Sequence, residues 1–208
     1  MNQHSLNVCL IVAHPDDETL WAGGMILMHP RWRCFIFSLC RARDPDRAPK
    51  FKQALSCLGA LGAMADMDDG PKQHPLSRRA LQHTILSGID ATVYDLVISH
   101  GPKGEYTRHR RHEEVSQAVH ELVQRHEISC SELWQFAYED GGGQYNPRAI
   151  THASCTVSLP DDIWNRKHKI ITEIYGFAPE SWEARITPRT EAFQKVNVLK
   201  SGSFGFLA

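Results

Sequence analysis

Apolar runs that alternate with amphipathic segments are the feature that most restricts how this chain can fold. Four runs have the length and apolar content of strands: 6–12, 33–39, 94–100 and 130–138. Apolar residues spaced three and four apart predict helices over 17–28, 48–61, 76–89, 112–126 and 161–175. Strands alternating with helices favour a sheet covered on both faces. We therefore expect an α/β fold, a Rossmann-like three-layer domain with a mostly parallel sheet.

Size and composition restrict the function classes. The 208 residues predict a single domain over 1–208, and the net charge of −1 gives no field that attracts the whole molecule to nucleic acid or a membrane. No apolar run approaches the roughly 18 residues of a membrane span, and the first residues do not resemble a signal peptide. The six scattered cysteines are typical of reduced thiols. We expect a cytoplasmic protein with a small-molecule partner and with no nucleic-acid or membrane partner. A homo-oligomer is compatible with these features.

The first predicted strand runs directly into the hexapeptide AHPDDE, residues 13–18. Ligands of parallel α/β sheets bind at the carboxyl ends of strands, so this is where a site is expected. His14 and Asp17 are three residues apart, and one turn of helix puts both on one face, where a nitrogen and a carboxylate oxygen suit zinc. Asp16 then points elsewhere and is free to take a proton from water. Helix capping would explain one or two carboxylates but not His14.

A second segment supplies candidates for a further ligand. Catalytic zinc commonly has three protein ligands, so another loop at the same sheet edge should contribute. After the strand over 94–100, GPKGEYTRHRRHEEV places His109 and His112 one helical turn apart, where the next helix begins. One of them is expected to bind the metal and the other to act as an acid or charge stabiliser. His100, which ends the strand, is expected to structure the loop.

AHPDDE followed downstream by H-x-x-H at the start of a helix resembles the PIG-L/LmbE-like family of metal-dependent N-acetylglucosaminyl deacetylases. The resemblance is clear from Val8 to about Gln124 and weak beyond. It implies a metal-dependent amide hydrolase that removes an N-acyl group, expected to be N-acetyl, from an amino sugar or glycoconjugate. The implied cofactor is Zn²⁺, with Fe²⁺ or another divalent metal as the alternative.

The resemblance also implies a role for each residue of the two motifs. His14, Asp17 and His112 match the metal ligands of the family, and Asp16 matches its general base. His109 matches the histidine that stabilises the oxyanion, a role expected of its protonated form. In this hypothesis the metal polarises the acyl oxygen and activates water, while Asp16 accepts the water proton.

The chain departs from the family pattern in the second motif. The family usually has H-P-D-H, whereas this chain has HRRH with Arg110 and Arg111 between the histidines. An aspartate that would orient a ligand is therefore missing, and Glu113 and Glu114 are the candidates to replace it.

Substrate contacts are expected from arginines, which suit an anionic group, and from tyrosines on loops, which stack on sugar rings. The arginines considered are Arg41, Arg43, Arg108, Arg110 and Arg111, with surface exposure as the alternative reading. The glycine-rich segment 139–147 is either a lid or a surface loop. The candidate substrate-binding residues are Arg43, Arg108, Tyr106 and Tyr145.

Three alternatives stay open at this point. A non-haem iron(II) oxygenase also uses two histidines and one carboxylate, although such enzymes are usually antiparallel barrels. A nucleotide-binding module would use the same sheet edge, but the chain lacks G-x-G-x-x-G after its first strand and has no P-loop. A family member that binds metal or a glycan without turnover is the third.

Overall fold

The computed structural model describes residues 5–107 and 109–198, so Arg108 lies outside the described residues. The strands are β1 Asn7–Val12, β2 Arg33–Cys40, β3 Leu61–Met67, β4 Val93–Ser99, β5 Ser129–Phe136, β6 Tyr138–Glu139, β7 Arg148–Ala149, β8 Cys155–Ser158 and β9 Thr190–Val196. The helices are α1 Asp17–Met28, α2 Arg47–Leu58, α3 Arg78–Gly88, α4 Arg110–Gln124, α5 Asp161–Lys169, the π-helical turn η1 Ile170–Ile174 and α6 Trp182–Ile186.

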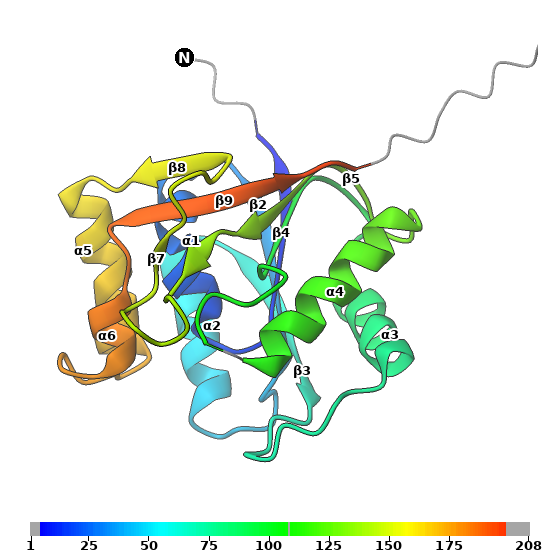
Figure 1. Ribbon diagram of the computed structural model, residues 1–208, viewed down its shortest axis with the longest axis horizontal. Coiled ribbons are helices and arrows are strands. Elements are labelled where there is room, and N and C mark those ends of the chain that lie inside the picture. The colour runs from blue at the N-terminus through cyan, green and yellow to red at the C-terminus, as the bar shows by residue number, and fades with distance from the viewer. Residues whose placement is uncertain (1–4, 108, 199–208) are drawn as a thin grey trace, which may run out of the picture.

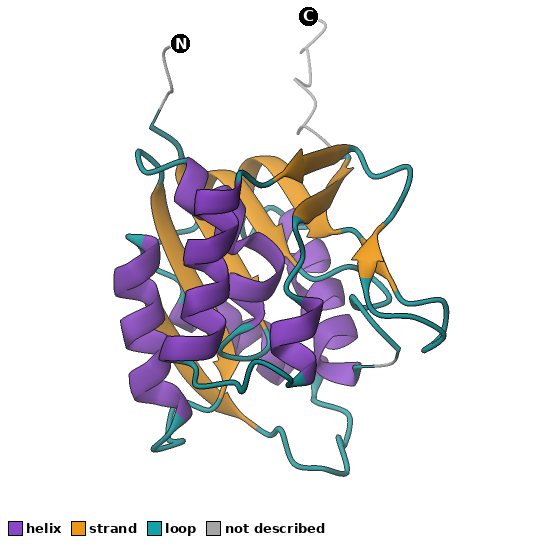
Figure 2. Ribbon diagram, turned by 90° about the vertical axis from the view of Figure 1, so that its left-hand side faces the viewer, coloured by secondary structure: helices purple, strands orange, loops and turns teal. Residues whose placement is uncertain are grey.

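The predicted three-layer α/β architecture is confirmed. A seven-stranded sheet has the order β3-β2-β1-β4-β5-β9-β8. Strands β1 to β5 are parallel, β9 is antiparallel to β5, and β8 is antiparallel to β9. Figures 1 and 2 show the sheet between two layers, with α1, α2, α5 and α6 on one side and α3 and α4 on the other. Among the described residues, no helix combines the length and apolar content needed to cross a bilayer.

The central position of β1 follows from its residues. Every residue from Val8 to Val12 is buried, which requires cover on both faces of the sheet. Leu10 belongs to the core cluster beneath α1 and α2, whereas Ile11 belongs to the cluster beneath α3 and α4. Because successive side chains of a strand point to opposite faces, one apolar run supplies both cores.

The structure corrects two expected element boundaries. The helix expected over 48–61 ends at Leu58, because Gly59 adopts a left-handed conformation with φ 69° that terminates it. The chain then enters the edge strand β3, for which no strand was predicted. The helix expected over 161–175 is α-helical only to Lys169 and continues as the π-helical turn η1.

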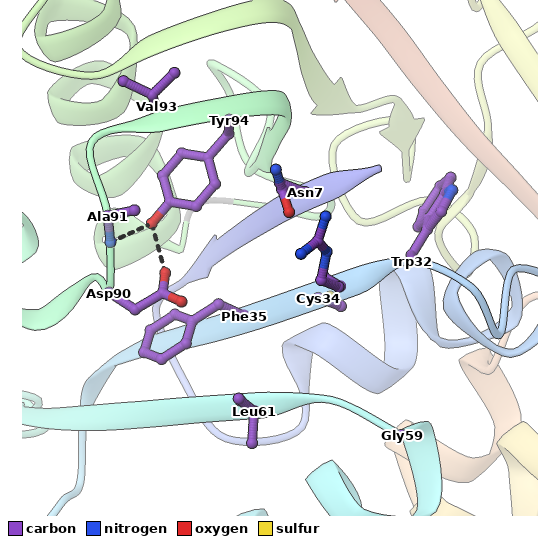
Figure 3. A pocket seen from close by; sticks show the side chains of 11 residues that line it. Asn7, Trp32, Cys34, Phe35, Gly59, Leu61, Asp90, Ala91, Val93 and Tyr94 are labelled. Atoms are coloured by element: carbon purple, nitrogen blue, oxygen red, sulfur yellow. Dashed lines mark hydrogen bonds between the residues drawn. The ribbon is translucent and has the colours of Figure 1, made fainter. Parts of the chain in front are cut away.

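A cavity of about 500 Å³ lies at the amino ends of the parallel strands (Figure 3). Leu61 and Val93 line it and are 73% and 70% exposed. The hydroxyl of Tyr94 donates to Asp90 Oδ1 (2.8 Å) and accepts from the backbone N–H of Ala91 (3.0 Å). In this cavity the Tyr94 hydroxyl, the Asp90 carboxylate and the Ala91 N–H therefore bond to one another (Figure 3).

Candidate metal centre and active site

The residues singled out in the two motifs come together at the opposite, carboxyl end of the sheet. The loop from β1 into α1 carries His14, Asp16 and Asp17, and the loop from β4 into α4 leads to His109 and His112. Strands β1 and β4 are neighbours in the sheet, yet β1 connects along the chain to β2 on its other side. The site thus lies at a topological switch point, where α/β sheets of this type bind ligands.

Three atoms of His14, Asp17 and His112 form a nearly equilateral triangle. His14 Nδ1 lies 3.2 Å from Asp17 Oδ2, and His112 Nε2 lies 3.3 Å from both atoms. Ligands at about 2.0 Å from a tetrahedral Zn²⁺ are roughly 3.3 Å apart. The spacing of the three atoms therefore fits the donor set of a tetrahedral metal ion.

The tautomer of His112 is set by Glu105. Glu105 is fully buried, and its Oε2 lies 2.5 Å from Nδ1 of His112 and 2.9 Å from Nδ1 of His100. Both rings donate to this carboxylate from Nδ1. For His100 this follows because its Nε2 already accepts the backbone N–H of Ala13 (2.9 Å). The Nε2 of His112 is thereby left with a lone pair that faces Asp17. His100 structures the loop, as its place at the end of the strand predicts.

Asp69 sets the tautomer of His14 in the same way. The Nε2 of His14 lies 3.1 Å from Asp69 Oδ1, so its proton is held there and Nδ1 is left with a lone pair. Arg41 donates to Asp69 Oδ2 from Nε (2.9 Å) and Nη2 (2.7 Å). Although burial opposes ionisation, the bonds from His14 and Arg41 lower the pKa of Asp69 to about 2. Asp69 therefore stays ionised as the partner of His14.

Asp17 is held by bonds to both of its oxygens. Oδ1 accepts from Trp21 Nε1 (3.2 Å), and Oδ2 accepts from the backbone N–H of His14 (2.9 Å). Burial tends to raise the pKa of Asp17, but the neighbouring imidazoles of His112 and His100 outweigh it and lower that pKa. The carboxylate thus points its Oδ2 at the two imidazoles in the ionised form that a metal requires.

Asp16 points away from this triangle, as predicted. It precedes α1 with φ 117°, a backbone conformation that non-glycine residues rarely adopt, and its side chain makes no capping bond to the helix. Its Oδ2 instead accepts from Arg47 Nη1 (3.0 Å). Burial, followed by the charge of Asp17, raises the pKa of Asp16, so its carboxylate is a stronger base than an exposed aspartate.

His109 lies beside the triangle with a ring nitrogen that lacks a partner. Its ring stacks on His112 with centroids 4.3 Å apart, and it meets the edge of His14 at 4.6 Å. Within residues 5–107 and 109–198, its buried Nδ1 has no hydrogen-bond partner. Burial, together with the neighbouring His112 and His14, lowers the pKa of His109 to about 3. This lowered pKa favours a neutral imidazole, whereas the sequence-based expectation was a protonated one.

Three other arrangements of ligand atoms in the described residues are compatible with a metal. Ligand atoms within 4.8 Å of one another are found in three sets: His14, His109 and His112; Asp17, His100 and His112; and His14, Cys40 and Asp69. A metal bound by Asp17, His100 and His112 would require His100 to lose the hydrogen bond that its Nε2 accepts from the Ala13 N–H. In the set that contains His109, that ring is farther from the Asp17 carboxylate. His14, Asp17 and His112 form the tighter set at 3.2–3.3 Å.

A polar cavity of about 200 Å³ opens above these groups. The structure places Tyr106 in its lining and Tyr145 in that of an adjoining cavity. Arg43 lies elsewhere: it is 87% exposed, pairs with Asp66 and lines neither cavity. The residues that line the cavity are His14, Pro15, Asp16, Asp17, Leu20, Arg41, Arg47, Asp69, Tyr106, His109, Trp182 and Glu183.

The arginines of the HRRH motif have structural contacts. Arg111 is fully buried and donates to Glu114 (2.6 Å), to the side chain of Asp68 (3.1 Å) and to the backbone oxygen of His74 (2.9 Å). Arg110 donates to the backbone oxygen of Gln73 (2.6 Å). Both residues fasten the 68–74 segment to α4 rather than pointing into the cavity.

Five residues of the site were missed by reasoning from sequence: Glu105, Asp69, Arg47, Trp182 and Glu183. Glu105, and neither Glu113 nor Glu114, orients His112. Its position between the strand and H-x-x-H, in GEY, was a usable signal. Asp69 follows β3 at the same sheet edge, and recognising that strand would have placed it there. Trp182 and Glu183 lie in a segment whose sequence pattern predicts no element.

Comparison with known proteins supports the fold. No family model matches the chain. An uncharacterized protein of Acanthamoeba polyphaga mimivirus is 20% identical over an alignment of 189 residues that covers 84% of this chain and 78% of that protein. The 4-carboxy-2-hydroxymuconate hydratase GalB from Pseudomonas putida has a TM-score of 0.63 at 13% identity, covering 94% of this chain and 98% of its own.

Deacetylases of the teicoplanin biosynthetic pathway are also similar in structure. A triple mutant has a TM-score of 0.63 at 14% identity over 92% of this chain and 99% of its own. A zinc-inhibited form of teicoplanin deacetylase has a TM-score of 0.56 at 13% identity over 81% and 83%. At these identities the comparisons show that the chain shares its fold with a hydratase and with deacetylases.

Proposed function

We propose that the chain is a metal-dependent amide hydrolase of the PIG-L/LmbE-like family that removes an N-acyl group, expected to be N-acetyl, from an amino sugar or glycoconjugate. The observation that carries this proposal is the triangle of His14 Nδ1, Asp17 Oδ2 and His112 Nε2 at 3.2–3.3 Å. Three lone pairs at that separation repel one another unless a cation or a proton lies between them. The motif resemblance and the deacetylases that share the fold support the choice of reaction.

A divalent cation held by His14, Asp17 and His112 would polarise an acyl carbonyl and lower the pKa of a coordinated water. Zn²⁺ is the first candidate because two imidazoles and one carboxylate in tetrahedral spacing suit it. Fe²⁺ or another divalent metal is the alternative, and the zinc-inhibited form of teicoplanin deacetylase makes excess zinc a condition to control.

Asp16 is the base in this proposal. Its carboxylate lines the cavity and is not directed at the three metal-facing atoms, so it is available to accept a proton from water. The ion pair with Arg47 at 3.0 Å favours its ionised form, in opposition to the burial and the Asp17 charge that raise its pKa. The strained backbone at φ 117° holds the side chain toward Arg47 and the cavity.

His109 serves as a neutral hydrogen-bond donor. With its pKa lowered to about 3, the imidazole carries one N–H and no charge. A donor placed toward the acyl oxygen stabilises the negative charge that develops there, and losing one such donor typically costs about 100-fold to 1000-fold in rate. The unpartnered Nδ1 of His109 is consistent with a partner supplied by the substrate.

The test combines metal content with turnover. We expect about one equivalent of zinc or iron in the purified wild type by mass spectrometry, together with acetate release from a panel of N-acetyl sugars. His112→Ala should lose both, while His83→Ala on the exposed face of α3 should keep both.

Two outcomes would count against the proposal. Metal without acetate release would reject N-acetyl sugars as substrates and direct the search to other acyl amides or to hydration, the reaction of a structural neighbour. No metal in wild type, even after supplementation with zinc and iron, would reject the metal centre itself.

A further inference from the structure

Glu18 is the acidic residue of AHPDDE that the proposed mechanism does not use. It is fully buried in the first turn of α1 and does not line the inner cavity, the one of about 200 Å³ above the metal-facing atoms. Its Oε2 accepts the backbone N–H of Asp16 (2.9 Å). Its Oε1 accepts the hydroxyls of Thr19 (2.6 Å) and Tyr175 (2.7 Å). Glu18 therefore joins the backbone of the proposed base to a residue from the far end of the chain.

The backbone of Asp16 needs such support because its φ of 117° is one that non-glycine residues rarely adopt. A conformation of this kind persists only where the surrounding structure fixes it. The carbonyl oxygen of Asp16 accepts from the N–H groups of Thr19 (3.0 Å) and Leu20 (2.8 Å). Its own N–H is held by Glu18. The direction of the Asp16 side chain thus depends on the Glu18 carboxylate as well as on α1.

Tyr175 reaches Glu18 across 157 positions of the sequence. It is 2% exposed, directly follows the π-helical turn η1, and does not line the inner cavity. The turn η1 packs against both α1 and α2, and the first turns of these helices carry Glu18 and Arg47. Helical turns of the π type are frequent at functional sites. One short segment therefore meets the two helix ends beside Asp16.

Phe177 contacts the second of these helix ends. Its ring lies beneath the guanidinium of Arg47, with 4.7 Å from Cζ to the ring centroid, and Arg47 Nη1 donates to Asp16 Oδ2 (3.0 Å). The ring quadrupole attracts the cation and so restricts where the guanidinium lies. Phe177 is partly buried and does not line the inner cavity. Its route to Asp16 therefore runs through Arg47.

We propose that Tyr175 and Phe177 are positioning residues for the base Asp16. Tyr175 acts through Glu18 on the backbone of Asp16. Phe177 acts through Arg47 on its carboxylate. This inference rests on the proposed function and adds to it two residues far from both motifs. Because neither ring lines the inner cavity, the substrate does not contact them, and their loss should lower kcat while KM is kept.

The first test measures acetate release from the N-acetyl sugar that the wild type turns over fastest. Tyr175→Phe should lower kcat by roughly 3-fold to 30-fold, and Phe177→Leu by roughly 2-fold to 10-fold, with KM within about twofold and metal content unchanged. Phe177→Tyr keeps an aromatic face and should restore kcat to within about twofold of wild type. Tyr94→Phe, which loses a buried hydroxyl at the opposite end of the sheet, is the matched control and should keep kcat.

The second test asks whether the Tyr175 hydroxyl acts through Asp16. In the Asp16→Asn background no carboxylate base is left to position, so adding Tyr175→Phe should not lower the residual rate further. A further fall as large as that in the wild-type background would show a route that bypasses Asp16 and would overturn the inference.

The third test needs no turnover and separates failure of this inference from failure of the proposed function. NMR on the purified protein follows hydrogen exchange of the Asp16 amide, which should be at least threefold faster in Tyr175→Phe and unchanged in Tyr94→Phe. If wild type releases no acetate, faster exchange supports the positioning of Asp16 and rejects the deacetylase reaction alone. Exchange at the wild-type rate in Tyr175→Phe, or an unchanged kcat in an active enzyme, would overturn the inference.

Discussion

A cavity lies at each end of the central sheet, but the polar groups of the two cavities differ in whether they bond to one another or converge on one point. At the amino end, a cavity of about 500 Å³ is lined by the exposed Leu61 and Val93, and Tyr94 and Asp90 bond to each other. At the carboxyl end, the inner cavity measures only about 200 Å³, yet the lone pairs of three side chains converge there. Cavity size therefore does not identify the site of chemistry in this molecule, whereas convergent lone pairs do.

The difference follows from the topology of the parallel sheet. At the carboxyl ends, the chain leaves β1 and β4 for the amino termini of α1 and α4, which bring backbone N–H groups and polar side chains together. The amino ends receive the chain from α1, α2 and α3, whose last residues, Met28, Leu58 and Gly88, carry no charge.

The largest contrast between the two ends should come from removing one carboxylate at each. Asp16→Asn should lower acetate release by roughly 100-fold to 10,000-fold while metal content is unchanged, because the base is lost and the ligands remain. Asp90→Asn at the amino-end cavity should leave turnover unchanged. Metal analysis and initial rates on both variants check this. Full activity in Asp16→Asn would remove the base assignment.

A smaller effect is expected from the group that orients a ligand. Glu105→Gln should weaken metal affinity by about 10-fold to 100-fold, because an amide cannot accept from His100 and His112 as a carboxylate does. Competition with a metal-binding dye measures the affinity. Glu113→Gln, at the position considered from sequence, is the matched control and should bind metal as wild type does. Equal affinity in all three proteins would show that Glu105 does not position His112.

The amino end should respond in stability rather than in metal binding. Tyr94→Phe removes the bonds to Asp90 and to the Ala91 N–H, so the free energy of unfolding should fall by about 1 kcal/mol. Urea denaturation followed by circular dichroism measures it, and metal content should not change. A loss of metal in Tyr94→Phe would contradict the separation of the two ends.

The smallest effect concerns the pH dependence of stability that Asp140, which follows β6, contributes. Burial tends to raise the pKa of Asp140, but the hydrogen bonds from Thr107 outweigh burial and lower that pKa below its ordinary 3.8. Because the folded pKa is the lower one, the ionised carboxylate stabilises the fold above about pH 4, and this contribution is lost as the pH falls through the lowered pKa.

Asp140→Asn tests this dependence. The variant should be less stable than wild type to urea at pH 7, and the difference should shrink toward pH 3. A difference that is the same at both pH values would mean that the ionisation of Asp140 does not contribute.

Much of the fold was predictable because its signals are local. The apolar run before AHPDDE predicts a strand buried on both faces, and the structure places it at the centre of the sheet. The alternation with helices predicts the layers. The edge strand β3 was not predicted, because its sequence LGAMADM is only partly buried and lacks both a clear apolar run and strict alternation.

The sequence by itself determined which chemistry is available and where along the chain it lies. His14 and Asp17 are brought near each other by one turn, and H-x-x-H does the same for His109 and His112, so short-range spacing sufficed to single them out.

Only the tertiary structure decided which distant residues complete the site. Asp69 reaches His14 across 55 positions, Arg47 reaches Asp16 across 31, and Trp182 meets Tyr106 from the far end of the chain. No local pattern encodes such pairings, because they depend on the order of strands in the sheet and on where each connecting segment packs. The replacement of the missing aspartate by Glu105 has the same cause, since its carboxylate meets His112 only once the loop folds back over β4.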